Sequence, residues 1–220
     1  MARVGVLALQ GAFAAHARAL ARLGHEAVLA RRPADLDGVD GLVLPGGEST
    51  TQLRLLERQG LAPALERLRQ AGVPVLATCA GLILLARRVT GPEQPSLGWL
   101  DVDVARNAWG RQVESFEAAA DPPRDDLPLV LIRAPRITAA GDGVEVLATY
   151  AGEPVLVRQG AVTGATFHPE LTDRLDVHRE VFGDAAPLAS RDEGRLVRSS
   201  APSVTSSTDA RVSRGRRPPG

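Results

Sequence analysis

The most constraining feature of this sequence is an alternation of short apolar runs with helix-like segments between residues 4 and 90. The run at 4–9 is typical of a strand buried on both faces, and the apolar spacing over 12–23 predicts a helix that stops at Gly24. Ser49 stands where a helix N-cap belongs. The alternation predicts a parallel sheet covered by helices. Further strands are expected at 26–30, 40–45 and 73–78, and helices at 49–56, 61–70 and 82–89.

The second half of the chain has a different pattern, in which short strand-like runs are separated by Gly, Pro and Asp turns. We expect some of these strands to be antiparallel additions to the same sheet or a small side sheet. A short helix over 176–182 closes the pattern. The expected strands are 97–104, 113–117, 129–132, 144–150, 154–157 and 162–167.

The segment 189–220 lacks aliphatic periodicity and is rich in Ser, Arg, Pro and Gly. It carries seven arginines against three acidic residues, a net charge of +4 that leaves −4 on the rest of a formally neutral chain. We therefore expect one domain over 1–188 and a disordered basic tail over 189–220. The zero overall balance argues against a nucleic-acid binder, although contact through the tail stays a weak hypothesis.

Composition excludes several kinds of chemistry. All 26 basic residues are arginine, which rules out a Schiff-base lysine and a phosphate-loop lysine in this chain. One cysteine, Cys79, excludes an internal disulfide and a multi-cysteine metal site, and no metal site is expected. Since the sequence contains neither a signal peptide nor a long apolar run, we expect no membrane span and a cytoplasmic location.

Cys79 lies at the predicted junction of a strand and a helix, between the small residues Ala77 and Gly81. Small residues suit the sharp turn of a nucleophile elbow, which lifts the side chain above the carboxyl end of a sheet. The first N–H groups of the following helix would favour the thiolate. The alternative is a buried structural cysteine.

His168 and Glu170 could supply a base and a carboxylate that orients it. They are separated by Pro169, and positions i and i+2 of an extended segment point the same way. The alternative is a surface turn at a strand end. The other histidines, His16, His25 and His178, are expected to be surface or helix-end residues.

Gly46 and Gly47 close the predicted strand at 40–45. Glycines there allow backbone N–H groups to face a ligand, so the amides of Gly47 and Ala80 could form an oxyanion hole. The alternative is an ordinary turn with a left-handed glycine.

Taken together, six segments resemble the class I (triad) glutamine amidotransferases, and more specifically the glutaminase subunits of pyridoxal 5'-phosphate synthase, the PdxT family. The resemblance implies a flavodoxin-like, three-layer α/β fold with a mostly parallel, doubly wound sheet and antiparallel additions. The segments are 7–12 (LALQGA), 44–50 (LPGGEST), 78–81 (TCAG), 106–112 (RNAWGRQ), 132–137 (IRAPRI) and 167–172 (FHPELT).

The resemblance also implies residue roles. Cys79 would attack the side-chain amide of L-glutamine, His168 would protonate the leaving ammonia and activate water, and Glu170 would orient His168. Gln10 would help to order the oxyanion loop when a partner docks. The substrate-binding positions would be Gly46, Gly47, Glu48, Arg106, Ile132 and Arg133.

The partner implied is a synthase subunit that receives ammonia and makes pyridoxal 5'-phosphate, in an assembly of twelve copies of each subunit. No cofactor is implied in this chain. Two other hypotheses stay open: a different cysteine hydrolase of the same architecture, such as a γ-glutamyl hydrolase, and a non-catalytic protein with a decayed site. The presence of all three triad residues argues against the second of these.

Overall fold

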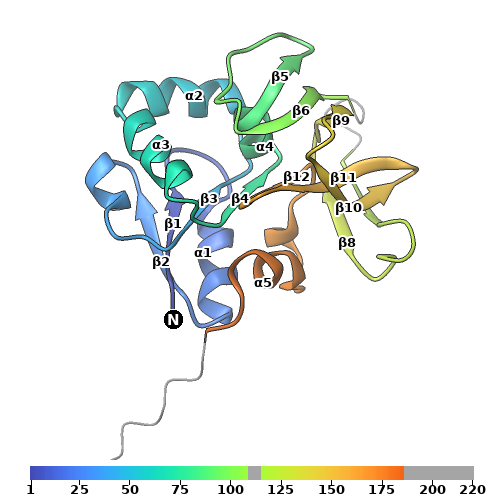
Figure 1. The fold of residues 1–220 in the computed structure, drawn as a ribbon. Coiled ribbons are helices and arrows are strands. Elements are labelled where there is room, and N and C mark those ends of the chain that lie inside the picture. Colours follow the sequence, from blue (N-terminus) through green and yellow to red (C-terminus); the bar gives the residue numbers. More distant parts are fainter. Residues whose placement is uncertain (109–114, 186–220) are drawn as a thin grey trace, which may run out of the picture. The chain divides into compact units, whose positions relative to one another are not determined.

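A seven-stranded sheet forms the middle layer of the part that the computed structural model describes, residues 1–108 and 115–185 (Figure 1). Its strand order is β10-β11-β12-β4-β3-β1-β2. Neighbours from β12 to β2 are parallel, whereas β11 and β10 are antiparallel additions. The strands are β1 (Arg3–Leu7), β2 (Glu26–Ala30), β3 (Gly41–Leu44), β4 (Val75–Thr78), β10 (Glu145–Tyr150), β11 (Glu153–Gln159) and β12 (Val162–Ala165).

Helices cover both faces of this sheet, because the central strands present apolar side chains to both sides. Leu42 and Leu44 pack in one core with Leu56 and Leu65, while Val43 packs in the opposite core. The helices α2 (Ser49–Arg58), α3 (Ala62–Gln70) and α4 (Ala80–Leu85) belong to the first side, and α1 (Phe13–Arg22) and α5 (Asp176–Phe182) to the second. The expected fold class, a three-layer and mostly parallel α/β sheet with antiparallel additions, is confirmed.

Two small sheets extend this frame. In one, β5 (Ala86–Thr90) pairs in parallel with β6 (Leu100–Ala105), and β6 pairs antiparallel with β9 (Arg136–Ala140). In the other, β7 (Phe116–Ala119) and β8 (Pro128–Leu131) are antiparallel. Short 3₁₀ turns lie at Pro33–Leu36 and, as η2, at Pro169–Leu171.

The structure corrects three local predictions. The helix expected over 82–89 ends at Leu85, because the next residues include β-branched Val89 and Thr90 and pair with β6. No strand was predicted over 136–140, where β9 completes that sheet. Ser49 is the first helical residue of α2, not its cap: the Glu48 carboxylate accepts the N–H groups of Thr50 and Thr51.

The tail expected over 189–220 lies outside the described residues. Within 1–108 and 115–185, none of the helices combines the length and apolarity that crossing a bilayer requires. The same residues contain no grouping of three or more His, Cys, Asp or Glu side chains suited to a metal ion.

Candidate active site

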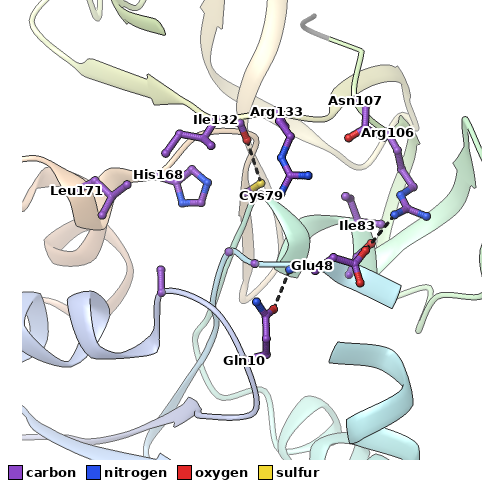
Figure 2. A pocket seen from close by; sticks show the side chains of 14 residues that line it. Gln10, Glu48, Cys79, Ile83, Arg106, Asn107, Ile132, Arg133, His168 and Leu171 are labelled. Atoms are coloured by element: carbon purple, nitrogen blue, oxygen red, sulfur yellow. Dashed lines mark hydrogen bonds and ion pairs between the residues drawn. The ribbon is translucent and has the colours of Figure 1, made fainter. Parts of the chain in front are cut away.

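The carboxyl ends of four neighbouring strands meet at one edge of the sheet and surround a cavity of about 360 Å³ (Figure 2). Gln10 follows β1, the Gly46–Glu48 loop follows β3, Cys79 follows β4 and His168 follows β12. Parallel strands end at the same edge of a sheet, which is where ligands bind in open α/β folds. Residues that are remote in sequence therefore share one pocket.

Cys79 occupies a strained turn between β4 and α4. Its φ of 47° and ψ of −103° are rare for a residue with a side chain, a conformation that costs roughly 1–3 kcal/mol and is typical of functional turns. The turn is anchored by the Cys79 N–H, which donates to the Ala165 carbonyl at 2.8 Å. A Cβ at Gly81 would overlap the backbone of Leu44, so the tight packing of this elbow requires glycine. Cys79 is 6% exposed and lines the cavity.

His168 lies beside Cys79 in the wall of the cavity (Figure 2). Glu170 is in η2, and its Oε1 lies 2.7 Å from His168 Nδ1. The backbone of His168 is fixed by its N–H, which donates to Val130 at 2.9 Å. Burial lowers the pKa of His168, but its hydrogen bonds to Cys79 and Glu170 outweigh this and raise the pKa to about 10. The arrangement favours the imidazolium form of His168 beside the Cys79 sulfur.

The Gly46–Glu48 loop is held from both sides. The Gly46 N–H donates to Thr78 Oγ1 at 3.0 Å, and its carbonyl accepts the N–H of Ala12 at 2.9 Å. The Glu48 N–H donates to Gln10 Oε1 at 2.8 Å. Side chains are excluded here, because a Cβ at Gly46 would overlap the His168 ring.

Gly47 has the same restriction, and a Cβ there would overlap the Gln10 side chain. Gly47 itself lines the cavity, as its predicted role in an oxyanion hole requires. Ala80, the other predicted donor, is buried at the start of α4 and is not one of the lining residues. Its amide belongs to the first helical turn, where N–H groups lack acceptors within the helix.

Charged groups form the opposite wall. Arg106 follows β6 and lies 3.3 Å from the Glu48 carboxylate. Burial raises the pKa of Glu48, but hydrogen bonds from Thr51 and Thr50 and the charge of Arg106 keep it below its usual value.

Ile132 and Arg133, after β8, complete this wall. The Ile132 carbonyl is 4.0 Å from Cys79 Sγ, and Arg133 has a φ of 46°. Of the predicted motif at 106–112, residues 109–112 lie outside the described residues.

Contrary to what the sequence had suggested, the remaining histidines are not at the surface. His16, on α1, and His178, on α5, are fully buried, and His25 is 6% exposed. His16 Nδ1 lies 2.9 Å from His178 Nε2. Helical spacing could have identified His16, because it lies on the buried face of α1 with Ala19 and Leu20.

Comparisons with known proteins agree with this geometry. The model of the SNO glutamine amidotransferase family matches residues 6–183. The pyridoxal 5'-phosphate synthase subunit PdxT of Geobacillus kaustophilus is 54% identical over 173 residues, covering 78% of this chain and 88% of its own. The protein of the same name from Thermotoga neapolitana is 50% identical over 180 residues, covering 80% and 96%.

Solved structures extend the likeness to three dimensions. A glutamine amidotransferase crystal structure has a TM-score of 0.75 and 47% identity, covering 81% of this chain and 96% of its own. The structure of PurLQS from Thermotoga maritima has a TM-score of 0.61 at 17% identity, covering 82% and 98%, which indicates a shared fold alone. By its sequence and its structure, this chain belongs to the SNO glutamine amidotransferase family.

Proposed function

We propose that this protein is the glutaminase subunit of a pyridoxal 5'-phosphate synthase, and that it hydrolyses L-glutamine to L-glutamate and ammonia. The observation that carries the proposal is the meeting of Cys79, on its strained elbow, with the His168–Glu170 pair at one cavity. Support also comes from the 54% identity with a protein named as a subunit of that synthase.

In the first step, the Cys79 thiolate attacks the carbonyl carbon of the glutamine side-chain amide. The developing oxyanion is stabilised by backbone N–H groups, for which Gly47 and Ala80 are the candidates. The His168 imidazolium then gives its proton to the leaving nitrogen, and the C–N bond breaks. The products of this step are ammonia and a γ-glutamyl thioester on Cys79.

In the second step, neutral His168 removes a proton from water, which attacks the thioester carbonyl. Collapse of this second tetrahedral species breaks the C–S bond and releases glutamate, and the thiolate and the imidazolium are restored. Glu170 keeps the His168 Nδ1–H directed at its own Oε1, so that Nε2 faces the reacting atoms.

Substrate recognition falls to the charged wall and the glycine loop. Arg106 or Arg133 would bind the α-carboxylate of glutamine, and Glu48 would bind its ammonium group. Gly46, Gly47 and Ile132 would supply backbone contacts close to Cys79. Gln10, which already accepts the Glu48 N–H, would set the oxyanion loop when the partner docks.

The ammonia would pass to a synthase subunit of the type that forms pyridoxal 5'-phosphate, in an assembly of twelve copies of each subunit in the cytoplasm. The domain at 1–188 would carry this activity without a bound cofactor. The tail at 189–220 would lie outside the catalytic unit.

The test is ammonia release from L-glutamine by the full-length chain, with and without the cognate synthase subunit. The Cys79→Ala protein is the blank, since it lacks the nucleophile. Release that is stimulated by the synthase supports the proposal. Cleavage of γ-glutamyl peptides without any stimulation would instead identify a γ-glutamyl hydrolase, and docking without turnover would identify a decayed enzyme.

A further inference from the structure

The second carboxylate oxygen of Glu170, Oε2, takes no part in the proposed reaction. Glu170 Oε1 faces His168, but Oε2 is buried and makes no hydrogen bond of standard geometry within the described residues. The side chain of Glu170 is fully buried, so water does not surround this oxygen. A buried carboxylate oxygen without a donor is costly, and a carboxylate held at one oxygen can rotate.

His16 is positioned to supply the missing donor. Its Nε2 lies 3.3 Å from Glu170 Oε2 and 3.1 Å from Thr78 Oγ1. On the other side of the ring, Nδ1 lies 2.9 Å from His178 Nε2, and the two rings are tilted by 52° with centroids 5.1 Å apart. This buried cluster therefore joins α1, α5 and the end of β4 to the triad.

The hydrogen-bond inventory decides where the protons are. Burial lowers the pKa of His16, and that of His178 to about 3, so both rings are neutral near neutral pH. Protons on both Nδ1 atoms would turn the Nε2 lone pair of His16 towards the Glu170 carboxylate and leave the His178 Nδ1–H without an acceptor. Protons on both Nε2 atoms place the His16 Nε2–H between Glu170 Oε2 and Thr78 Oγ1 and leave His178 Nδ1 as an unpaired acceptor, which costs less than a buried N–H without an acceptor.

We propose that His16, held in its tautomer by His178, is a positioning residue that fixes Glu170 by donating its Nε2–H to Oε2. The inference rests on the proposed function, since it concerns the same triad. With both oxygens held, the Glu170 carboxylate cannot rotate, and Oε1 stays aligned with His168 Nδ1. His16 is not one of the residues that line the cavity, so it acts through its contacts to Glu170 and Thr78.

The Thr78 contact gives His16 a second connection to the site. Thr78 Oγ1 accepts the N–H of Gly46 and lies within hydrogen-bonding distance of His16. The same imidazole thereby links the triad carboxylate to the glycine loop. A movement of α1 would therefore displace both the Glu170 carboxylate and the glycine loop.

The matched variants are His16→Gln and His16→Asn. The amide nitrogen of glutamine extends to about the position of Nε2, whereas that of asparagine stops near Nδ1. Both remove the imidazole and keep a polar amide. In the complex with its synthase, we expect His16→Asn to lower kcat by about 10- to 100-fold, the effect of one hydrogen bond to a charged group, with KM within about 3-fold. His16→Gln should stay within about 3-fold of wild type for both constants.

The acid limb of the kcat profile is a second readout. Glu170 faces His168 and His16, and His178 faces His16 from α5. Burial raises the pKa of Glu170, but the nearby His16 ring and the hydrogen bond and charge of His168 keep it below its usual value. Losing a donor to the ionised form raises this pKa, so the limb should move to higher pH by about one unit in His16→Asn but not in His16→Gln.

Equal kcat in the two variants, or an acid limb that does not move in His16→Asn, would overturn the proposal, since a purely structural role treats both amides alike. If His16→Asn does not fold, His178→Phe replaces it, because it removes the group that fixes the His16 tautomer. That variant should lower kcat by about 3- to 10-fold and move the limb upward, and wild-type values for both would equally overturn the proposal.

Alkylation of Cys79 by iodoacetamide separates this inference from the proposed function, because it needs neither glutamine nor synthase. When Glu170 is protonated, it no longer stabilises the His168 imidazolium, whose positive charge favours the thiolate form of Cys79. The rise of alkylation rate with pH should therefore move upward in His16→Asn alone. If the wild-type protein releases no ammonia but the alkylation profile shifts in His16→Asn, the glutaminase assignment is wrong and the role of His16 stands. If the alkylation profile does not shift in His16→Asn, the proposed role of His16 is wrong.

Discussion

The two sides of the cavity are held in place by different means. On the nucleophile side, Cys79 and the Gly46–Glu48 loop are set by a positive φ, by glycines that admit no Cβ and by hydrogen bonds of backbone amides, two of which go to the side chains of Thr78 and Gln10. On the base side, His168 and Glu170 depend on side chains that reach them from other elements, including His16 on α1.

This difference has a physical origin. A strand-to-helix turn can be specified by a few consecutive small residues, since its geometry is local. The orientation of a buried carboxylate depends on the groups beside both of its oxygens, and here only one of them is local. His168 is two residues away from Glu170, whereas His16 is on the first helix. Substitutions on the two sides should therefore have different effects on kcat, KM and stability.

The largest effect is expected for Cys79→Ala, which removes the reagent and keeps the turn. Glutamine turnover should fall by about 10⁴-fold or more, since no other group can form the thioester. Stability should change by less than about 1 kcal/mol, because alanine removes a single sulfur atom and fits the same tight turn. Kinetics and thermal unfolding measure the two quantities, and residual turnover near wild type would refute Cys79 as the nucleophile.

Gly46→Ala tests the contact between the glycine loop and His168, where the two sides of the cavity meet. The added methyl group would overlap the His168 ring, and the loop is anchored at Ala12 and Thr78, so the ring must move. We expect kcat to fall by about 100-fold, the usual effect of a displacement near 1 Å in a catalytic group.

Gly143→Ala is the matched control, because its Cβ would meet only the end of the Gln159 side chain. The control should keep wild-type kcat. If Gly46→Ala behaves like Gly143→Ala, the contact between the glycine loop and His168 has no catalytic importance.

Arg106→Ala concerns binding more than chemistry. Its guanidinium is 3.3 Å from Glu48 at the wall of the cavity. We expect KM for glutamine to rise about 10-fold or more with kcat nearly unchanged, as for an interaction made equally in the ground and transition states. Arg87→Ala, on β5 of the same small sheet and paired with Asp101 and Asp103, is the control and should change neither constant. An unchanged KM in Arg106→Ala would remove Arg106 from the binding site.

The smallest effect is expected for deletion of residues 189–220. The family model ends at residue 183, and the cavity is formed by residues 10–171. Synthase-stimulated ammonia release should change by less than about 2-fold, within the range of substitutions remote from a site. A large loss would place part of the catalytic unit in the tail.

Much of the nucleophile side could be predicted from the sequence. On this side, β3, β4 and the Cys79 turn were predicted within two residues at each end, and elsewhere in the fold β2 and α5 were predicted to the residue. Buried parallel strands are recognisable because they are continuous apolar runs. The boundary at Leu85 was not predictable from apolar periodicity alone, since the strand after it exists only through pairing with β6.

The surroundings of the base could not be predicted in the same way. The sequence contains His168 and Glu170 at a spacing that suits a base and its carboxylate, and the structure has them 2.7 Å apart. Nothing local identifies the partner of the second carboxylate oxygen, and His16 was wrongly expected at the surface. Its burial follows from the packing of α1 against the triad turn.

By itself, then, the sequence determined the layered α/β architecture, the strained cysteine turn and the identity of the triad candidates, because each depends on residues that are close together in the chain. Only the tertiary structure decided that His16, His178 and Thr78 lie behind Glu170, and that Arg106 reaches Glu48. Those contacts join separate elements of the fold. Burial gives them their energetic importance, because a polar atom away from water needs a hydrogen-bonding partner, and here the partner comes from another part of the chain.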